Sequence, residues 1–310
     1  MKIVGIGETV FDILFRDGRP LAAIPGGSTF NAMVSLGRTV GKIDASIDVS
    51  MVTRIGTDAV GDMIVSFMSE NNLSLRYVDR VDKSQSILSI AMLNEKNDAS
   101  YEFYRDSSVS GFQPSDIDFR PGDVVLFGSY FAIGPSSREA TQRLVRKAKD
   151  SGAIIYYDIN FRKSHLLELP ETKKFIEDNC AMSDFVRGSS EDIGYLYGSS
   201  DAAEVYSGHI SALCPLFICT KGADATEIFT PSLHCVYPVD RIKTVSTIGA
   251  GDNFNAGFLY ALVKAGYSKE RLSALSSDDW SCLVPTAHRF SSNVCRSLFN
   301  YVDEDFDPGS

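Results

Sequence analysis

The sequence predicts an α/β fold with a doubly wound, mainly parallel sheet, helices on both of its faces, and a small additional β-sheet. Short apolar runs rich in β-branched residues show little polar alternation, which is typical of strands buried on both faces. Longer segments of helical periodicity separate these runs, as in successive βαβ units. One region, residues 84–105, interrupts this alternation and indicates the additional sheet.

The predicted elements alternate along most of the chain. The expected strands cover residues 2–6, 50–55, 123–128, 153–159, 184–186 and 216–220, and the expected helices cover residues 28–40, 58–71, 136–150, 171–180 and 202–213.

Residues 84–105 have the pattern of a β-hairpin, with two extended arms around a polar turn at residues 94–100. Together with residues 13–24 they are expected to form a small sheet that stands off the main domain. An ordinary edge hairpin is the alternative interpretation. The closing residues 302–310 are acidic and contain Pro and Gly, so we expect them to be frayed.

Composition limits the classes of function. The 310 residues are 44% apolar and 23% charged, which suits one large α/β domain or two smaller ones. The first residues lack the pattern of a signal peptide, and no apolar stretch is long enough to span a bilayer, so a cytoplasmic protein is expected. The net charge of −10 argues against nucleic acid or an anionic membrane as a partner.

Cysteine and histidine spacing gives no indication of zinc. The six cysteines contain no CxxC pair, and the four histidines show neither HExxH nor H-x₃₋₅-H spacing. Most of the cysteines lie in apolar surroundings, so buried free thiols are expected.

The segment IGAGDNF, residues 248–254, carries the strongest chemical signal. Apolar residues after it recur at helical spacing, so a helix is expected to begin near Ala250. Unpaired N–H groups in its first turn and the helix dipole create an anion site, and Gly249 and Gly251 allow close approach. Asp252 at this site is placed to accept a proton from an attacking hydroxyl. The alternative is a capping residue beside a glycine turn.

A second glycine-rich entry to a helix lies at residues 26–38, GGSTFNAMVSLGR. Asn31 falls in its first turn and offers a donor and an acceptor, which suits neighbouring sugar hydroxyls. Asp12 follows the first strand, near the carboxyl end where open α/β sheets bind ligands, and could accept bonds from two hydroxyls. A surface Asn near an N-cap and a solvated loop carboxylate are the alternatives.

These motifs together resemble the ribokinase-like (pfkB) family of carbohydrate kinases. Gly26-Gly27 with Asn31 is similar to the family's first signature, and residues 248–257 are similar to its second. RIGTDAVGD at residues 54–62, DINFR at 158–162 and TKGA at 220–223 fall between them in the family's order. The resemblance covers nearly the whole chain and implies one ribokinase-like kinase domain over residues 1–310. The small sheet, about residues 13–24 and 84–105, would be its lid.

The resemblance assigns the catalytic groups. It makes Asp252 the general base and the Gly249, Ala250 and Gly251 amides the anion hole. The phosphoryl donor would be ATP with Mg²⁺, since transfer needs charge neutralised across the phosphates.

It also implies the binding residues. Asp12, Gly27 and Asn31 would bind the sugar, with Phe103 of the lid as a further contact. Thr220 and Gly222 would border the nucleotide, and Asn293 or a neighbour in the last helix would lie near the adenine. Arg162 is expected to assist phosphate binding, with a structural ion pair as the alternative. Lid closure would exclude water, and lids in this family often mediate dimers, so a homodimer through the lid is an expectation.

Two positions depart from the family pattern. Ser246 stands where the family usually has an Asp in a loop that many members use to bind a monovalent cation, so potassium activation is uncertain. The family's Asn-x-x-Glu segment corresponds to residues 189–192, where Ser189 replaces the amide and Asp192 keeps a carboxylate. Asp192 is the candidate for a water-mediated contact with Mg²⁺.

The substrate implied is a non-phosphorylated sugar, because Ser28-Thr29-Phe30 fills the position where relatives acting on sugar phosphates carry a basic residue. The arm ending YEFYR, residues 101–105, resembles the fructokinase and 2-keto-3-deoxygluconate kinase branches, so fructose or a related keto sugar is expected.

A nucleoside kinase of adenosine type is one alternative. A sugar- or nucleotide-binding homologue without catalysis is another, and a Rossmann dehydrogenase is disfavoured because Val10 replaces the third glycine after Gly5-Ile6-Gly7.

Overall fold

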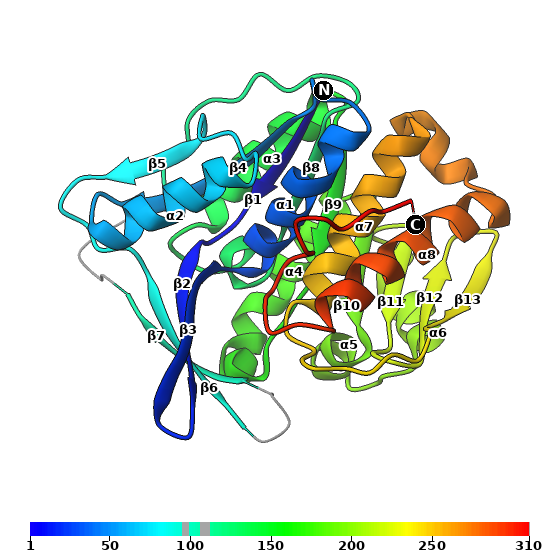
Figure 1. Ribbon diagram of the computed structural model, residues 1–310. Coiled ribbons are helices and arrows are strands. Elements are labelled where there is room, and N and C mark those ends of the chain that lie inside the picture. Colours follow the sequence, from blue (N-terminus) through cyan, green and yellow to red (C-terminus); the bar gives the residue numbers. More distant parts are fainter. Residues whose placement is uncertain (95–98, 106–111, 310) are drawn as a thin grey trace. The chain divides into compact units, whose positions relative to one another are not determined.

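The computed structural model describes residues 1–94, 99–105 and 112–309 (Figure 1). Its contacts divide the chain into two compact units. The N-terminal unit comprises Lys2–Asp116, Ile242–Tyr260 and Thr286–Ser310, and the central unit comprises Ile117–Arg241 and Ala261–Pro285 together with Met1. The boundary crosses two helices, α7 (Ala250–Ala265) and α8 (Ser277–Val294). The expectation of one domain over residues 1–310 stays a prediction.

The N-terminal unit contains three parallel strands of the predicted type. β1 (Lys2–Ile6) pairs with β4 (Asp48–Gly56), and β4 pairs with β5 (Val78–Val81). Ile3, Val4 and Ile6 are fully buried, as the apolar run of β1 predicts. The helices of this part are α1 (Ser28–Thr39), the short 3₁₀ helix η1 (Val40–Lys42) and α2 (Ala59–Glu70).

A second, four-stranded sheet lies in the same unit, in the order β3-β2-β6-β7 (Figure 1). Its strands are β2 (Val10–Arg16), β3 (Arg19–Gly26), β6 (Leu88–Leu93) and β7 (Ala99–Tyr104). The hairpin β6-β7 joins the hairpin β2-β3 because β2 and β6 pair in parallel. The predicted small sheet is therefore confirmed, and the edge-hairpin interpretation is wrong. Most of the predicted turn, residues 95–98, lies outside the described residues.

The central unit holds six strands in the order β8-β9-β10-β11-β12-β13, of which the first four are parallel and the last two antiparallel. The strands are β8 (Val124–Gly128), β9 (Ile154–Asp158), β10 (Phe185–Ser189), β11 (Phe217–Thr220), β12 (Ala225–Phe229) and β13 (His234–Pro238). Its remaining helical segments are η2 (Tyr130–Ala132), α3 (Arg138–Asp150), η3 (Lys163–Glu168), α4 (Leu169–Met182), α5 (Ser190–Tyr197), α6 (Ala202–Val205), η4 (Tyr206–Ile210) and η5 (Lys269–Ala274). The predicted α/β class with a mainly parallel sheet is confirmed.

Two sequence expectations differ from the structure. The helix expected over residues 202–213 is α-helical only over Ala202–Val205 and continues as the π-helical turn Tyr206–Ile210, which contains the poor helix former Gly208. The closing residues 302–309 are not frayed. Val302 is fully buried, and Phe306 packs edge-on against Phe290 of α8 at 4.9 Å between ring centroids.

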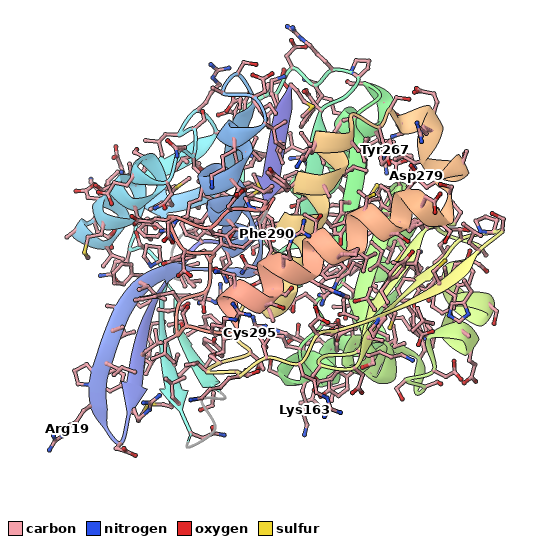
Figure 2. All side chains as sticks on the ribbon, turned by 45° about the vertical axis from the view of Figure 1, so that its right-hand side comes forward. Arg19, Lys163, Tyr267, Asp279, Phe290 and Cys295 are labelled. Atoms are coloured by element: carbon pink, nitrogen blue, oxygen red, sulfur yellow. The ribbon has the colours of Figure 1, made fainter. Side chains whose placement is uncertain are left out.

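The start of α8 is fixed by a capping box that also contacts the preceding segment. Ser276 Oγ accepts from the Asp279 N–H at 3.2 Å, and Asp279 Oδ2 accepts from the Ser276 N–H at 2.8 Å. Tyr267 donates its hydroxyl hydrogen to Asp279 Oδ1 at 2.6 Å, and both side chains are labelled in Figure 2. The hydrogen bonds from Tyr267 and Ser276 lower the pKa of Asp279 to about 2.

We expect Asp279→Asn to lower the thermal midpoint at pH 7 by about 2–4 °C, the shift that a lost cap worth about 1 kcal/mol produces. Because the folded pKa lies below the unfolded value of about 3.9, this stabilisation is present above about pH 4 and disappears as the pH falls toward 2. Thermal melts of wild type and variant between pH 7 and 2 measure the effect. Asp278→Asn, an exposed carboxylate in the same turn, is the matched control. Equal shifts in both variants would contradict the capping role.

Candidate active site

The loop that enters α1 requires both of its glycines. A Cβ atom at Gly26 would overlap the Asp12 carboxylate, and one at Gly27 would overlap the carbonyl oxygen of Glu8. Gly27 also has φ +121°, in the region that favours glycine. The Gly-Gly pair therefore lets the start of α1 approach Asp12 and the segment that follows β1.

Asp12 is fixed by the small sheet. It lies on β2, is 5% exposed, and its Oδ1 accepts a hydrogen bond from Ser89 Oγ of the neighbouring strand β6. The alternative of a solvated loop carboxylate is therefore wrong, because pairing of β2 with β6 buries the side chain.

Asn31 and Asp252, which are 221 positions apart in sequence, are hydrogen-bonded. Asn31 Nδ2 donates to Asp252 Oδ2 at 2.9 Å. Asn31 is 4% exposed, and within the described part of the chain its Oδ1 is buried without a hydrogen-bond partner. A surface Asn is excluded, and an unsatisfied buried acceptor suits a donor from a bound molecule, such as a hydroxyl.

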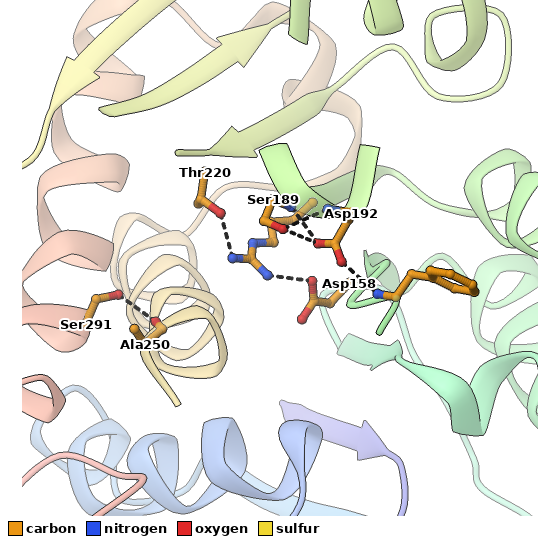
Figure 3. Close-up of polar contacts among 8 residues, drawn as sticks. Asp158, Ser189, Asp192, Thr220, Ala250 and Ser291 are labelled. Carbon is orange, nitrogen blue, oxygen red and sulfur yellow. Dashed lines mark hydrogen bonds and ion pairs between the residues drawn. The ribbon is translucent and has the colours of Figure 1, made fainter. Parts of the chain in front are cut away.

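The segment before α7 is the candidate anion site. Gly249 has φ +77°, and α7 begins at Ala250 as predicted. The Ala250 N–H donates to Thr247 O at 3.2 Å, whereas the Gly251 and Asp252 amides occupy positions for which a helix provides no acceptor. Ser291 Oγ of α8 donates to Ala250 O at 2.8 Å and holds this turn in place (Figure 3).

Arg105, at the end of β7, is a contact that sequence reasoning missed. Its guanidinium pairs with the Glu8 carboxylate, with Nη2 to Oε2 at 2.9 Å, and lies 5.0 Å from the ring centroid of Phe103. This ion pair joins the small sheet to the segment that follows β1. Phe103 is 41% exposed and stacks on Tyr101, and a role in sugar binding stays a prediction.

In the central unit a buried arginine joins three adjacent parallel strands (Figure 3). Arg187 of β10 is 6% exposed and donates from Nη1 to Asp158 Oδ1 at 3.0 Å and from Nη2 to Thr220 Oγ1 at 2.6 Å. Asp158 and Thr220 are the last residues of β9 and β11, where open α/β sheets bind ligands. Burial tends to lower the pKa of Arg187, but the nearby Asp158 and Asp192 carboxylates raise it by more than burial lowers it. The guanidinium therefore stays protonated. Sequence reasoning missed this group, although an arginine within an apolar strand is a signal of a buried polar contact.

Asp192 is engaged by the protein on both carboxylate oxygens. Its Oδ2 accepts from the Ser189 N–H at 2.6 Å and its Oδ1 from the Phe161 N–H at 2.8 Å (Figure 3). Burial, opposed by Arg187, raises its pKa. Over the described residues no group of three or more His, Cys, Asp or Glu side chains is placed to hold a metal ion. A water-mediated contact of Asp192 with Mg²⁺ stays a prediction.

The remaining predicted residues occupy varied surroundings. Gly222, with φ +56°, forms the turn after β11. Arg162 is exposed at the start of η3. Asn293 of α8 donates from Nδ2 to Asp303 Oδ2 at 2.9 Å and accepts from the Asp303 N–H at 3.0 Å, so its amide binds the closing segment. Roles of these three residues in binding phosphate or nucleotide stay predictions.

The arrangement in the N-terminal unit can carry out acid–base chemistry on a hydroxyl. The Asp252 carboxylate is half-buried, is oriented by Asn31, and lies in the first turn of α7. A base at a helix N-terminus places proton acceptance beside amides that stabilise a phosphoryl group.

No helix in the described part of the chain combines the length and the hydrophobicity of a membrane-spanning segment.

Comparisons with known proteins agree with this chemistry. A fructokinase from Rhizobium leguminosarum bv. trifolii is 28% identical over 270 residues, which cover 84% of this chain and 79% of the relative. The structure of Vibrio cholerae O395 fructokinase with fructose, ADP and calcium matches with TM-score 0.81 and 20% identity, over 96% of this chain and 94% of that chain. Aminoimidazole riboside kinase from Salmonella enterica, with its riboside and an ATP analogue, matches with TM-score 0.80 and 20% identity, over 99% and 97% of the two chains. The model of the pfkB family of carbohydrate kinases matches residues 4–277. The chain therefore belongs to the pfkB family of carbohydrate kinases and is an ATP-dependent sugar kinase.

Proposed function

We propose that this kinase transfers the γ-phosphoryl group of ATP to a hydroxyl of fructose or a related keto sugar, with Asp252 as the general base. The observation that carries the proposal is the hydrogen bond from Asn31 Nδ2 to Asp252 Oδ2, which links the glycine-rich entry of α1 to the first turn of α7. Fructokinases among the relatives support fructose, and the similarity to aminoimidazole riboside kinase supports a nucleoside-type substrate as the alternative.

In the proposed reaction Asp252 accepts the hydroxyl proton while the sugar oxygen bonds to the γ-phosphorus. The bond from this phosphorus to the β,γ-bridging oxygen breaks, and ADP leaves. The amides at residues 249–251 stabilise the charge on the transferred group, with Gly251 best placed because Ala250 donates to Thr247 O. Their fixed position requires little reorganisation during the reaction.

Asp12, Gly27 and Asn31 are the proposed sugar-binding groups. A carboxylate such as that of Asp12 can accept several hydrogen bonds, and Asn31 Oδ1 can accept from a hydroxyl. Both side chains are buried, and a bound sugar would satisfy Asn31 Oδ1, which water reaches poorly.

The small sheet is the proposed lid, which would exclude water as a competing acceptor. It carries exposed apolar side chains on several strands, namely Leu21, Met92, Phe103 and Tyr104. These support the expectation of a homodimer through the lid, since exposed apolar side chains suit a contact with another chain. A cytoplasmic location also stays a prediction.

We propose that Mg²⁺ enters with ATP, held mainly by phosphates and water, because both oxygens of Asp192 already accept hydrogen bonds. When bound, the ion neutralises charge on the phosphates. Ser246 offers a neutral hydroxyl in place of a carboxylate, and its Oγ already accepts from the Ile248 N–H at 3.2 Å. We therefore propose that turnover does not depend on potassium.

Asp252→Asn should lower kcat by about 10²–10⁴-fold, the usual contribution of a general base, and change KM for the sugar much less. Asparagine keeps the size of the side chain but does not accept the proton. Steady-state kinetics with a coupled ADP assay measure the loss, and a thermal melt verifies folding. Asp278→Asn, a carboxylate in the first turn of α8, is the matched control. A kcat within threefold of wild type would remove Asp252 from the base role.

Among fructose, 2-keto-3-deoxygluconate, ribose and adenosine, fructose should give the highest kcat/KM. A neutral polyhydroxy substrate matches the carboxylate and amide of the proposed sugar site better than the anionic 2-keto-3-deoxygluconate. The fructokinases among the relatives favour fructose over ribose and adenosine. ADP release with each substrate at matched concentrations gives the ranking. Turnover of adenosine alone would favour the nucleoside alternative, and a preference for 2-keto-3-deoxygluconate would change the sugar assignment only.

Removing divalent ions with EDTA should abolish turnover, and adding MgCl₂ should restore it, because the phosphates need charge neutralisation.

Replacing potassium by a bulky organic cation at constant ionic strength should leave kcat unchanged. Activation by potassium of tenfold or more would contradict the interpretation of Ser246.

A further inference from the structure

Asn253, the residue after the proposed base, has all of its amide groups engaged inside the N-terminal unit. It is fully buried, and its Nδ2 donates to Gly249 O at 2.8 Å and to Asn300 O at 2.7 Å. Its Oδ1 accepts from Ser35 Oγ. Carbonyl oxygens only accept hydrogen bonds, so the orientation of this amide is fixed by its partners. One side chain therefore links α7, α1 and the segment near the C-terminus.

Residues 300–302 contact α1 and the loop that enters it. The Val302 N–H donates to Ser35 Oγ at 3.1 Å, and Val302 O accepts from Arg38 Nη1 at 2.6 Å. The Arg38 guanidinium lies 5.0 Å from the ring centroid of Tyr301. Tyr301 Oη donates to Pro25 O, the carbonyl immediately before the Gly-Gly pair, at 3.5 Å. The closing segment is thus tied to the proposed sugar-binding loop.

The same residues pack against the proposed anion site. A Cβ atom at Gly249 would lie 3.1 Å from Asn300 O and 3.2 Å from Asn300 Cα. The turn before α7 therefore rests directly on the backbone of Asn300, with little room to shift. Asn253 stabilises this contact because its Nδ2 donates to the carbonyl oxygens of both Gly249 and Asn300.

Helix α1 holds the first turn of α7 at two successive points. Asn31 bonds to Asp252, and Ser35, one helical turn later on the same face, bonds to Asn253. Asn31 is a proposed sugar ligand, whereas Ser35 is fully buried and its hydroxyl contacts Asn253 and the Val302 N–H. Loss of the Ser35 contact would remove one of these two bonds between α1 and the first turn of α7.

We propose that Asn253 is a positioning residue that, with Ser35 and residues 300–302, fixes the proposed base and anion site relative to the sugar. The inference rests on the proposed function of residues 249–252. Asn253 does not touch a reacting atom. It acts by holding the Gly249 carbonyl against Asn300 and so setting the direction of the amides that follow.

Asn253→Asp and Asn253→Ala should lower kcat about 10²-fold, the effect of a misplacement of about 1 Å at a reacting centre. KM for the sugar should stay within about threefold, because the sugar contacts of Asp12 and Asn31 remain. The Asp variant keeps the shape but directs an oxygen at two carbonyl oxygens. Ser35→Ala should give a smaller loss of kcat. The double variant Ser35→Ala with Asn253→Ala should lose less than the product of the two single losses, since the Ser35–Asn253 bond is removed only once and the Val302 N–H bond to Ser35 is the additional change.

Asn179→Ala is the matched control, because Asn179 of α4 is also fully buried and donates to a backbone carbonyl, Ala132 O, at 3.3 Å in the central unit. It should lower the thermal midpoint without changing kcat. All kinetics are measured well below each variant's midpoint. If the Asn253 variants also lose only thermal stability and keep kcat within twofold, the inference is wrong. If they do not fold, an unchanged kcat in Ser35→Ala overturns it.

Asp252→Asn separates this inference from the proposed function. An inactive Asp252→Asn together with active Asn253 variants would remove the positioning role and leave the base assignment intact. An active Asp252→Asn would contradict the base assignment itself, whatever the Asn253 variants do.

Discussion

The hydrogen bond between Asn31 and Asp252 is the constraint around which the candidate site of the N-terminal unit is arranged. It requires the first turns of α1 and α7 to meet although they are 221 residues apart, and each neighbouring feature serves that approach. Gly26 and Gly27 remove the atoms that would keep α1 from Asp12 and Glu8. Ser291 and residues 300–302 make further contacts with the first turn of α7 and hold it in place. A carboxylate with this orientation has a defined direction in which to accept a proton.

In the central unit, a buried charged side chain joins the candidate residues, whereas in the N-terminal unit a buried amide does so. Arg187 is retained inside a parallel sheet because Asp158 and the Thr220 hydroxyl satisfy its two terminal nitrogens. Removing either partner would leave a buried cation short of acceptors, which costs more than the pair contributes. This links Thr220, a proposed nucleotide contact, to the DINFR segment, and makes the ends of three adjacent strands one polar group.

Much of the site was predictable because its residues are local signals. Asp252 and Asn31 both follow glycines at the start of a helix, a pattern that exposes backbone amides whatever the remaining fold. The family expected from the order of motifs is confirmed by the match over residues 4–277, whereas the catalytic roles stay predictions. Asn253, Arg105 and Arg187 were missed because each acts through a partner distant in sequence, and a polar residue by itself does not identify its partner.

Periodicity and glycine placement act over a few residues, so the α/β class, the start of α7 at Ala250 and the small sheet could be predicted from the sequence. Contacts between distant segments determine that β2 pairs with β6 and so buries Asp12, that Asn31 reaches Asp252, and that residues 302–309 are held in place and not frayed. Composition indicated an acidic, solvated end there. Burial of Val302, its N–H bond to Ser35 and the bond that its carbonyl accepts from Arg38 depend on surfaces that exist only once α1 and α7 are packed.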